Sequence, residues 1–480
     1  MKNLTVFPEK GWTEASLIEK LPICKRNDAS WDQGKIFGFV YHPGMDYVRV
    51  PEEYFRAFMY DSTLNPSTFP SLRNFEKDIV RMALELMHGK KGATGSLTTG
   101  GTESIFLALK VARDIAREKS GEEIPFEVVL PETIHPAFLK ACHILSLNPI
   151  LVPVGEDKRA DTEAMQQAIN SKTILLACSA PCFPYGVIDP VSQIGQIAKK
   201  HHLMFHVDAC MGGFLLPFLK DIGYSIPAFD FRVLGVSSIS LDAHKYGYAP
   251  KGTSIILYRN RTYRKKQFFV HADWSGGIFA STTFMGTKSG GPAAGCWAIM
   301  NRLGREGYRS IADQVMKTTN HIKEGIRELN SLRIISDPEM SVFAFTSIKG
   351  DIFNIGDALE SRGWHLDRLQ FPDALHLTIT QLNIGKEDDF LNDLKEILRD
   401  ESSLREQSEA TDSSVKLAGW LTVILPPSIF GALARMAGKI MGGKGNRSKA
   451  SQAALYGISA SFRNRKNVKK LVENLLDGMY

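Results

Sequence analysis

The amino-acid sequence predicts an α/β protein built on a mostly parallel β-sheet with helices on both of its faces. From about residue 90 to about residue 260, apolar strand-like runs alternate with helical stretches, a pattern typical of parallel sheets. From about residue 310 to 400 the elements become shorter and mixed, which predicts a small α+β domain. With 480 residues, 44% of them hydrophobic, the chain is long enough for several structural units.

Three parts follow from these patterns. We expect an N-terminal arm over residues 1–70 with a short helix near Glu14–Leu21, a large domain over 71–309, and a small C-terminal domain over 310–480. The large domain begins with a helix over Ser71–Met87, where apolar residues recur at helical spacing and Ser71 is the expected N-cap. Its strands are expected at Phe126–Leu130, Ile150–Pro153, Thr173–Cys178, Leu203–Asp208, Ser237–Leu241 and Thr253–Tyr258, and its helices at Ser104–Glu118, Ala137–Leu147, Thr162–Asn170 and Pro190–His201.

The small domain is expected to alternate helices with short strands. The helices are Ile311–Leu329, Ile355–Arg362 and Glu387–Arg399, and the strands are Arg333–Ile335, Val342–Thr346 and Leu375–Ile379. The polar stretch 401–416 has the composition of a linker.

Residues 417–443 form an apolar insertion, interrupted by Pro426-Pro427. Each half is too short to span a bilayer, and Arg435 and Lys439 lie in the second half. Two interpretations remain open: a helical hairpin that packs on the protein or a partner subunit, or a membrane-surface element that helps to reach a lipid substrate.

Composition and charge exclude several classes of protein. The net charge of +6 is modest and compatible with acidic or phosphorylated partners, but no Arg-rich run or zinc-finger spacing indicates nucleic-acid binding. The cysteines are scattered and form no metal-ligand set, so we expect no metal site; they are Cys24, Cys142, Cys178, Cys182, Cys210 and Cys296. Neither a signal peptide nor a spanning helix is recognisable, which predicts a cytosolic location.

A glycine-rich segment is the first candidate for chemistry. Thr99-Gly100-Gly101-Thr102 opens an apolar helix, and free N–H groups at a helix start favour an anion such as phosphate. The segment lacks the GK[ST] ending of a nucleotide-binding P-loop. By itself the signal is weak, because a Gly-Gly helix entry is more often only a tight turn.

A carboxylate and an amine complete the pattern. Asp208 ends the apolar run LMFHVDA, and the carboxyl ends of strands are where α/β sheets place ligand contacts. Lys245 follows another strand beside His244, and desolvation there would lower the pKa of Lys245, so that its amine can react with an aldehyde. Pyridoxal phosphate requires this combination of an amine, an acid for its pyridine nitrogen and a phosphate cradle.

Several long runs resemble one enzyme family. The sequence is similar to fold-type I pyridoxal-phosphate enzymes of the group II decarboxylase superfamily, and more narrowly to the sphingosine-1-phosphate lyases. The likeness covers about 7–399 and resumes near 454. The runs that carry it are TGGTESI, CSAPCFPYGVIDP, HVDACMGGF, SLDAHKYGYAPKG, DWSGGIFAS, GTKSGG and ALYGISASFRNR.

The resemblance implies a role for each matching residue. Lys245 matches the lysine that holds the cofactor as a Schiff base, Asp208 the acid at the pyridine nitrogen, and His135 the histidine that stacks on the ring. Gly101, Thr102 and His244 match phosphate-binding positions of the same subunit.

Other matches involve a second subunit and the substrate. Gly286 and Thr287 match positions that the second subunit contributes to the phosphate site, which implies an obligate homodimer. Lys251 matches a lysine that contacts the substrate phosphate. In the family an Asn and a His near the helix entry help to bind the substrate phosphate. Ser62 and Asn65 stand at those positions here; both can donate hydrogen bonds but carry no charge, and Asn65 is a candidate for substrate binding.

The implied activity is cleavage of the C2–C3 bond of a phosphorylated sphingoid base to a long-chain aldehyde and phosphoethanolamine. Candidates for the base are Lys245, His135, Tyr246 and Tyr248. Two alternatives remain: an amino-acid decarboxylase on the same scaffold, against which Lys251 and the C-terminal match speak, and a non-catalytic interaction protein that contacts membranes through 417–443.

Overall fold

A computed structural model describes most of the chain. Two compact units are present: Met1–Gln33 with Glu406–Tyr480, and Gly34–Arg405. The first unit contains α1 (Glu14–Lys25), which begins after Thr13, and the short η1 (Trp31–Gln33). All elements discussed below belong to the second unit. The described residues are 7–64, 67–121, 123–400, 469, 472–474 and 476–477.

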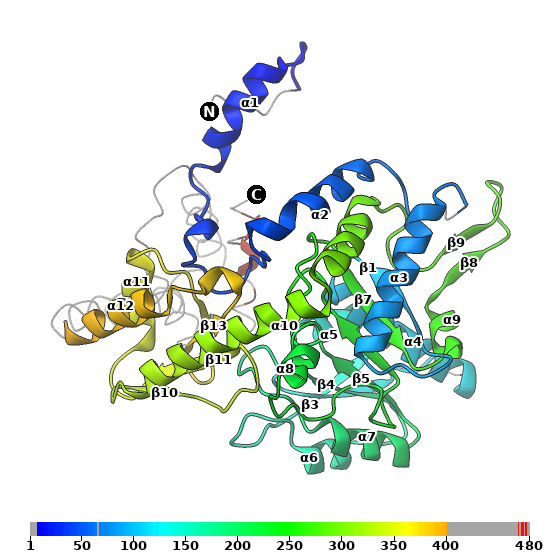
Figure 1. The fold of residues 1–480 in the computed structure, drawn as a ribbon. Helices are drawn as coiled ribbons and strands as arrows, with labels where there is room; N and C mark the ends of the chain where they lie inside the picture. The colour runs from blue at the N-terminus through cyan, green and yellow to red at the C-terminus, as the bar shows by residue number, and fades with distance from the viewer. Residues whose placement is uncertain are drawn as a thin grey trace. The chain divides into compact units, whose positions relative to one another are not determined.

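A seven-stranded sheet is the centre of this unit, with the order β1-β7-β6-β5-β4-β2-β3 (Figure 1). The pairs from β3 through β6 are parallel, whereas β7 is antiparallel to both β6 and β1. The prediction of a mostly parallel α/β sheet is therefore confirmed. The strands are β1 (Thr94–Thr98), β2 (Glu127–Pro131), β3 (Asn148–Val152), β4 (Thr173–Ser179), β5 (Met204–Asp208), β6 (Ser238–Leu241) and β7 (Ser254–Tyr258).

Helices cover this sheet because the central strands are apolar on both faces. Leu175 and Ala177 of β4 join the core beneath α4 and α5, and α7 packs against β4 and β5. Each large apolar side chain buried in this way contributes about 1.5–3 kcal/mol. The helices are α2 (Met45–Ala57), α3 (Pro70–Leu86), α4 (Gly101–Ser120), α5 (Ala137–Leu145), α6 (Thr162–Gln167), α7 (Val191–Lys200), α8 (Leu216–Asp221) and α9 (Arg261–Gln267).

The topology brings several strand ends to one edge of the sheet. Since β7 is antiparallel to β1 and to β6, strand β1 runs in the same direction as β6 and its parallel neighbours. The carboxyl ends of β1, β4, β5 and β6, at Thr98, Ser179, Asp208 and Leu241, therefore lie at the same edge. Ligand sites of open α/β sheets form at this edge.

A long helix leads from the large sheet to a smaller one. The helix α10 (Gly291–Arg327) contacts α2, α3 and α8, and further along its length β10 and α12, with a kink at Gly304 (Figure 1). The small sheet is antiparallel throughout, in the order β10-β11-β13-β12. Its elements are β10 (Leu332–Ile334), β11 (Val342–Ser347), α11 (Ile352–Ser361), β12 (Asp367–Leu369), β13 (Ala374–Thr378), η2 (Gln381–Asn383) and α12 (Glu387–Arg399).

A two-stranded hairpin, β8 (Phe269–His271) and β9 (Phe279–Ser281), extends from the large sheet after α9 (Figure 1). Its apolar side chains are unusually accessible: Val270 is 62% exposed, Trp274 54% and Ile278 77%. Phe284, just beyond β9, is 66% exposed. Exposed apolar residues gathered on one segment are typical of interaction surfaces.

Some sequence expectations differ from the structure. The helix α3 begins at Pro70, so Ser71 is not its N-cap, because proline fits the first helical position. Strand β1 was not expected, since its sequence TGSLT contains one large apolar residue. The expected helix Ile311–Leu329 is the second part of α10, which runs through the predicted boundary at 309–310; the domain limits remain a prediction. The segment 417–443 lies outside the described residues.

Candidate active site

A cavity of about 480 Å³ lies at the edge of the sheet where the strands end. It gathers most of the residues that the sequence singled out, although they are far apart along the chain. Residues of the small sheet and of the segment after Gln33 close its other side. The residues that line the cavity include Tyr41, Gly100, Gly101, Thr102, His135, Phe183, Asp208, Cys210, Asp242, His244, Lys245, Lys251 and Asp367.

Lys245 lies in this cavity in contact with a buried carboxylate. Its Nζ is 2.9 Å from Oδ2 of Asp242, which is 4% exposed. Burial lowers the pKa of Lys245, but Asp242 raises it, and the net shift is upward. The expectation that desolvation lowers this pKa is therefore wrong for the chain without cofactor, because the neighbouring carboxylate outweighs burial.

Asp242 is itself fixed from several sides. Burial raises its pKa, whereas Lys245 and His244 lower it, and the net pKa lies below the ordinary aspartate value. The hydroxyl of Ser254 on β7 donates a hydrogen bond to Oδ1. Asp242 therefore stays ionised beside the amine.

Asp208 is buried at the end of β5, with one carboxylate oxygen occupied by the protein. Its Oδ1 accepts hydrogen bonds from the backbone N–H of Cys210 and from the hydroxyl of Ser240, both at 3.0 Å. The imidazole of His206 contacts Ser240 in turn, at 3.2 Å between Nε2 and Oγ. This network leaves Oδ2 available to a group in the cavity.

His135 reaches the cavity from the segment between β2 and α5. Its Nδ1 accepts a hydrogen bond from the backbone N–H of Ala137 at 3.1 Å. Burial lowers the pKa of His135, and Asp208 opposes this only in part. The ring is therefore neutral at pH 7, with its proton on Nε2, and presents a flat uncharged face suited to stacking.

The start of α4 has the features of a phosphate cradle. A Cβ at Gly101 would lie 2.7 Å from Sγ of Cys210 and 2.9 Å from Oδ1 of Asp242, so a larger residue there would displace a neighbouring group. The first N–H groups of a helix lack intrahelical acceptors and attract anions. Nδ1 of His244 is buried without a hydrogen-bond partner in the described part of the chain. These residues fit a phosphorylated cofactor.

Lys251 lies at the side of the cavity, over the ring of Tyr41 at 5.0 Å. Its Nζ donates to the carbonyl of His244 at 3.4 Å. Burial lowers the pKa of Lys251, and the nearby Lys245 lowers it further. A partly desolvated cation here is suited to an anionic substrate group.

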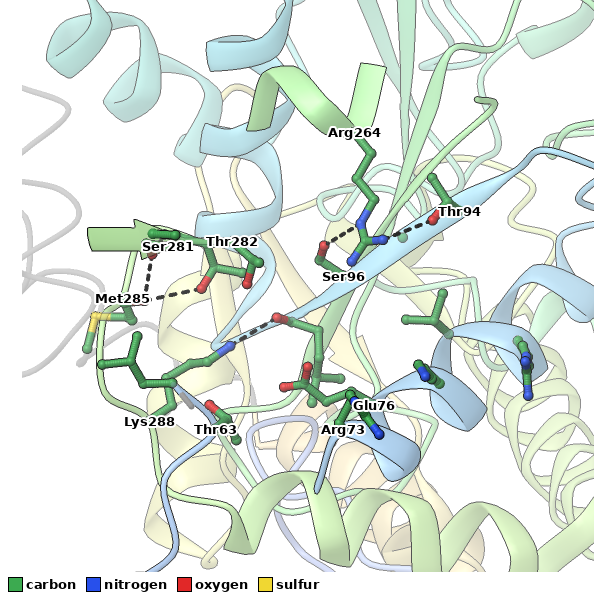
Figure 2. A pocket seen from close by; sticks show the side chains of 18 of the residues that line it. Thr63, Arg73, Glu76, Thr94, Ser96, Arg264, Ser281, Thr282, Met285 and Lys288 are labelled. Carbon is green, nitrogen blue, oxygen red and sulfur yellow. Dashed lines mark hydrogen bonds between the residues drawn. The ribbon is translucent and has the colours of Figure 1, made fainter. Parts of the chain in front are cut away.

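Gly286 and Thr287 do not line this cavity. Gly286 borders a second cavity of about 450 Å³ between α3, β1, α9 and the segment after β9 (Figure 2). Figure 2 shows Arg264 bonded there to Thr94 and Ser96 of β1, and Lys288 directed toward the same strand. Thr287 is exposed. Within one chain these two residues are therefore not assembled with Lys245.

Two of the four candidate bases are absent from the cavity lining. The hydroxyl of Tyr246 donates to the carbonyl of Ile379 at 2.9 Å and contacts Ser341, and Tyr248 stacks near Tyr308. Lys245 and His135 remain. Of the residues that replace the family's phosphate ligands, Asn65 lies outside the described residues.

Sequence reasoning assigned no role to Asp242 or Tyr41. Asp242 stands three residues before Lys245 in a turn, and that spacing was the available signal for a contact between them. Tyr41 precedes the large domain and gave no signal, since only the fold brings it to the cavity. Within the described residues, no three side chains suited to metal binding lie together, and no helix has the length and apolar character to cross a membrane.

Comparisons with known proteins identify the fold and the family. Residues 43–348 match the family described as the pyridoxal-dependent decarboxylase conserved domain. A solved glutamate decarboxylase from Lactobacillus brevis has the same fold, with a TM-score of 0.73 and 19% identity over 83% of this chain and 96% of that one. The fold and site thus define a fold-type I pyridoxal-phosphate enzyme.

More similar relatives narrow the class. Sphingosine-1-phosphate lyase of Arabidopsis thaliana is 43% identical over 82% of this chain and 74% of the plant protein, and sphingosine-1-phosphate lyase 1 of Rattus norvegicus is 41% identical over 81% and 69%. The structure of the Burkholderia pseudomallei lyase superposes with a TM-score of 0.80 at 35% identity, over 88% of this chain and 98% of that one. The chain belongs to the sphingosine-1-phosphate lyase family and is a pyridoxal-phosphate-dependent lyase.

Proposed function

We propose that this enzyme cleaves the C2–C3 bond of a phosphorylated sphingoid base, which yields a long-chain aldehyde and phosphoethanolamine. The observation that carries the proposal is the single cavity in which Lys245, Asp208, His135 and the Gly101 cradle meet, with Lys251 beside them. The relatives at 41–43% identity that are named for this activity support it.

The cavity residues would hold the cofactor at its distinct chemical groups. Lys245 would bind its aldehyde carbon, Asp208 its ring nitrogen, and His135 one face of the ring. The start of α4, with Gly101, Thr102 and His244, would bind its phosphate. Bound pyridoxal phosphate supplies an electron-poor ring that accepts the electron pair of a breaking bond at C2.

Side chains of the protein would hold or transfer the protons of the reaction and neutralise the substrate phosphate. Asp208 would keep the ring nitrogen protonated, because a buried carboxylate with one free oxygen pairs best with a cation. Lys245 would take the proton of the C3 hydroxyl, because it lines the cavity, whereas Nδ1 of His135 already accepts the N–H of Ala137 and its Nε2 carries the ring proton. Lys251 would neutralise the substrate phosphate, and Tyr41 limits the space around that cation.

A homodimer is the second part of the proposal. The exposed apolar residues Val270, Trp274, Ile278 and Phe284 precede Gly286 and Thr287 on one segment. Burying this segment against a second copy would remove apolar surface from water and bring Gly286 and Thr287 to the partner's cofactor site. A cytosolic location, and contact with a membrane surface through 417–443, rest on the sequence alone.

Product analysis tests the activity. The purified protein, supplied with pyridoxal phosphate, is incubated with sphingosine-1-phosphate, and long-chain aldehyde and phosphoethanolamine are measured by mass spectrometry. Lys245→Ala should abolish both products and the visible absorbance of the lysine–cofactor linkage. Carbon dioxide released from an amino acid, without aldehyde, would instead identify a decarboxylase, and absence of the absorbance would contradict the enzyme proposal altogether.

A further inference from the structure

Glu103, at the third position of α4, uses both oxygens of a buried carboxylate. Its Oε2 accepts hydrogen bonds from the backbone N–H of Thr99 at 2.6 Å and from the Thr99 hydroxyl at 2.8 Å. Its Oε1 accepts from the backbone N–H groups of Phe284 and Met285, at 2.8 and 3.3 Å. The side chain is 8% exposed. One carboxylate thus joins the cradle to a segment far along the chain.

A second tether connects the same two segments. Nζ of Lys288 donates to the carbonyl of Leu97 at 3.2 Å, and both residues line the second cavity, where Figure 2 shows Lys288. Leu97 lies on β1, just before the cradle. The segment 284–288 is therefore fastened at both ends to residues 97–103. Gly286 and Thr287 lie between the two fastening points.

This arrangement connects two different cofactor sites in a dimer. Residues 97–103 carry the phosphate cradle of the chain's own site. In the dimer proposed above, the segment 284–288 completes the phosphate site of the partner. A buried carboxylate with four charge-assisted hydrogen bonds is rigid, so a displacement on one side of Glu103 is transmitted to the other.

We infer that Glu103 is a positioning residue that couples the cofactor sites of the two subunits, because it aligns its own cradle and the segment that the partner's site requires. This inference rests on the proposed dimer. It predicts that a change at Glu103 alters cofactor binding in the other subunit. A residue that only stabilises its own fold would leave the partner's cofactor affinity unchanged.

Hybrid dimers separate these two roles. Two differently tagged chains are co-expressed, and dimers that contain one of each are purified. One chain carries Lys245→Ala, so that only the other chain forms the covalent linkage, and an absorbance titration with pyridoxal phosphate reports that site alone. Glu103→Gln is then placed in the Lys245→Ala chain, where it can act only on the partner.

Gln keeps the size of Glu103 but presents an amide N–H to one pair of donors, so one side of the bridge is lost. We expect cofactor affinity at the intact partner site to fall at least about tenfold relative to the hybrid with Lys245→Ala alone. Lys288→Met in the same chain should weaken that site in the same direction. Glu118→Gln is the matched control on α4; it is exposed, pairs with Lys266, and should change nothing.

The outcomes are distinguishable. Equal titration curves with and without Glu103→Gln would overturn the coupling, as would a loss of affinity that follows unfolding or dissociation in thermal melts and light scattering. If the wild-type protein is an active dimer but Glu103→Gln leaves the cofactor affinity of the partner site unchanged in the hybrid, only the inference about Glu103 is refuted. A wild-type protein that is monomeric or produces no aldehyde refutes the proposed function as well.

Discussion

At the scale of single residues, the neighbouring charges determine the protonation state of each side chain in the site. The Lys245 side chain is partly buried, which lowers its pKa, but Asp242 lies 2.9 Å away and the net pKa is raised. The chain without cofactor therefore holds its amine protonated. Cofactor capture requires that this proton leave, since only the neutral amine attacks an aldehyde.

Asp242→Asn should therefore change the pH dependence of cofactor capture. Removing the carboxylate removes the main factor that raises the pKa of Lys245, so the neutral amine becomes available at lower pH. We expect the midpoint of the capture rate to move to lower pH, as followed by stopped-flow absorbance after mixing with pyridoxal phosphate. Asp367→Asn, at another side of the cavity, is the control. An unchanged or higher midpoint would contradict this account of Asp242.

His206 lies outside the cavity lining and, in its neutral state, contacts the serine that donates a hydrogen bond to Asp208. Burial lowers the pKa of His206 to about 4, and its ring contacts Ser238 and Ser240, the latter bonded to Asp208. In the unfolded chain the pKa is ordinary, so the unfolded state binds the proton first as the pH falls. Stability from His206 is thus complete above about pH 6.5 and is lost toward pH 4.

His206→Asn should flatten this part of the acid response. Between pH 7 and pH 4.5, we expect the free energy of unfolding to fall by about 2–3 kcal/mol less in the variant than in the wild type. Chemical denaturation at both pH values provides the measurement. Asp189 and Asp367, whose pKa values burial raises to about 6, titrate in the same window with the opposite sign, but they are common to both proteins. Parallel pH curves would show that folding does not lower the pKa of His206.

At the scale of elements, the cradle depends on close approach between α4 and the strand ends. Gly101 lies against Cys210, which follows β5, and Asp242, which follows β6. A side chain there must displace either these two neighbours or the start of the helix, and we expect the helix start to move outward. The helix N–H groups would then no longer converge on the phosphate.

Gly101→Ala should consequently weaken cofactor affinity by about tenfold or more, measured by fluorescence titration of the chain stripped of cofactor. Cys210→Ala removes the Sγ that the new methyl group meets at 2.7 Å, so the double variant should recover part of the lost affinity. Cys210→Ala alone serves as the reference. No recovery, or no loss in the first place, would show that this contact does not set the cradle.

The sequence was informative about elements wherever a strand contains a run of apolar residues. Strands β2 to β7 were expected within a few residues because their apolar runs are continuous, and α12 matches its expected bounds. Strand β1 was missed because its pairing with β7, not its composition, makes it a strand. The motif around Lys245 located the cavity, but the partners of Asp242 and Glu103 depend on side-chain placement across the fold.

At the scale of the whole molecule, the cavity of one chain contains most of the residues predicted for the site, but not Gly286 or Thr287. Those two residues follow the exposed hairpin β8–β9. In the proposed homodimer, the second copy that covers the hairpin would also receive Gly286 and Thr287 at its cofactor site. Assembly and cofactor affinity should therefore change together.

Ile278→Asp tests this link. A charge at a side chain that is 77% exposed costs little in a single chain, but burying it against a partner without a counter-charge is costly. We expect the variant to become monomeric in light scattering and to lose cofactor affinity by at least about tenfold. Ile348→Asp, at an apolar residue 59% exposed on the small-sheet side, is the control. A dimeric Ile278→Asp protein with normal affinity would place the interface elsewhere.

The position of β1 has one more consequence. This strand ends the sheet order, so it has a single sheet neighbour, β7, yet the cradle follows it directly. Peripheral strands open more readily than central ones in local fluctuations of a native protein. Amide protons of Thr94–Thr98 should therefore exchange with deuterium sooner than those of β5, and loading with cofactor should slow that exchange selectively.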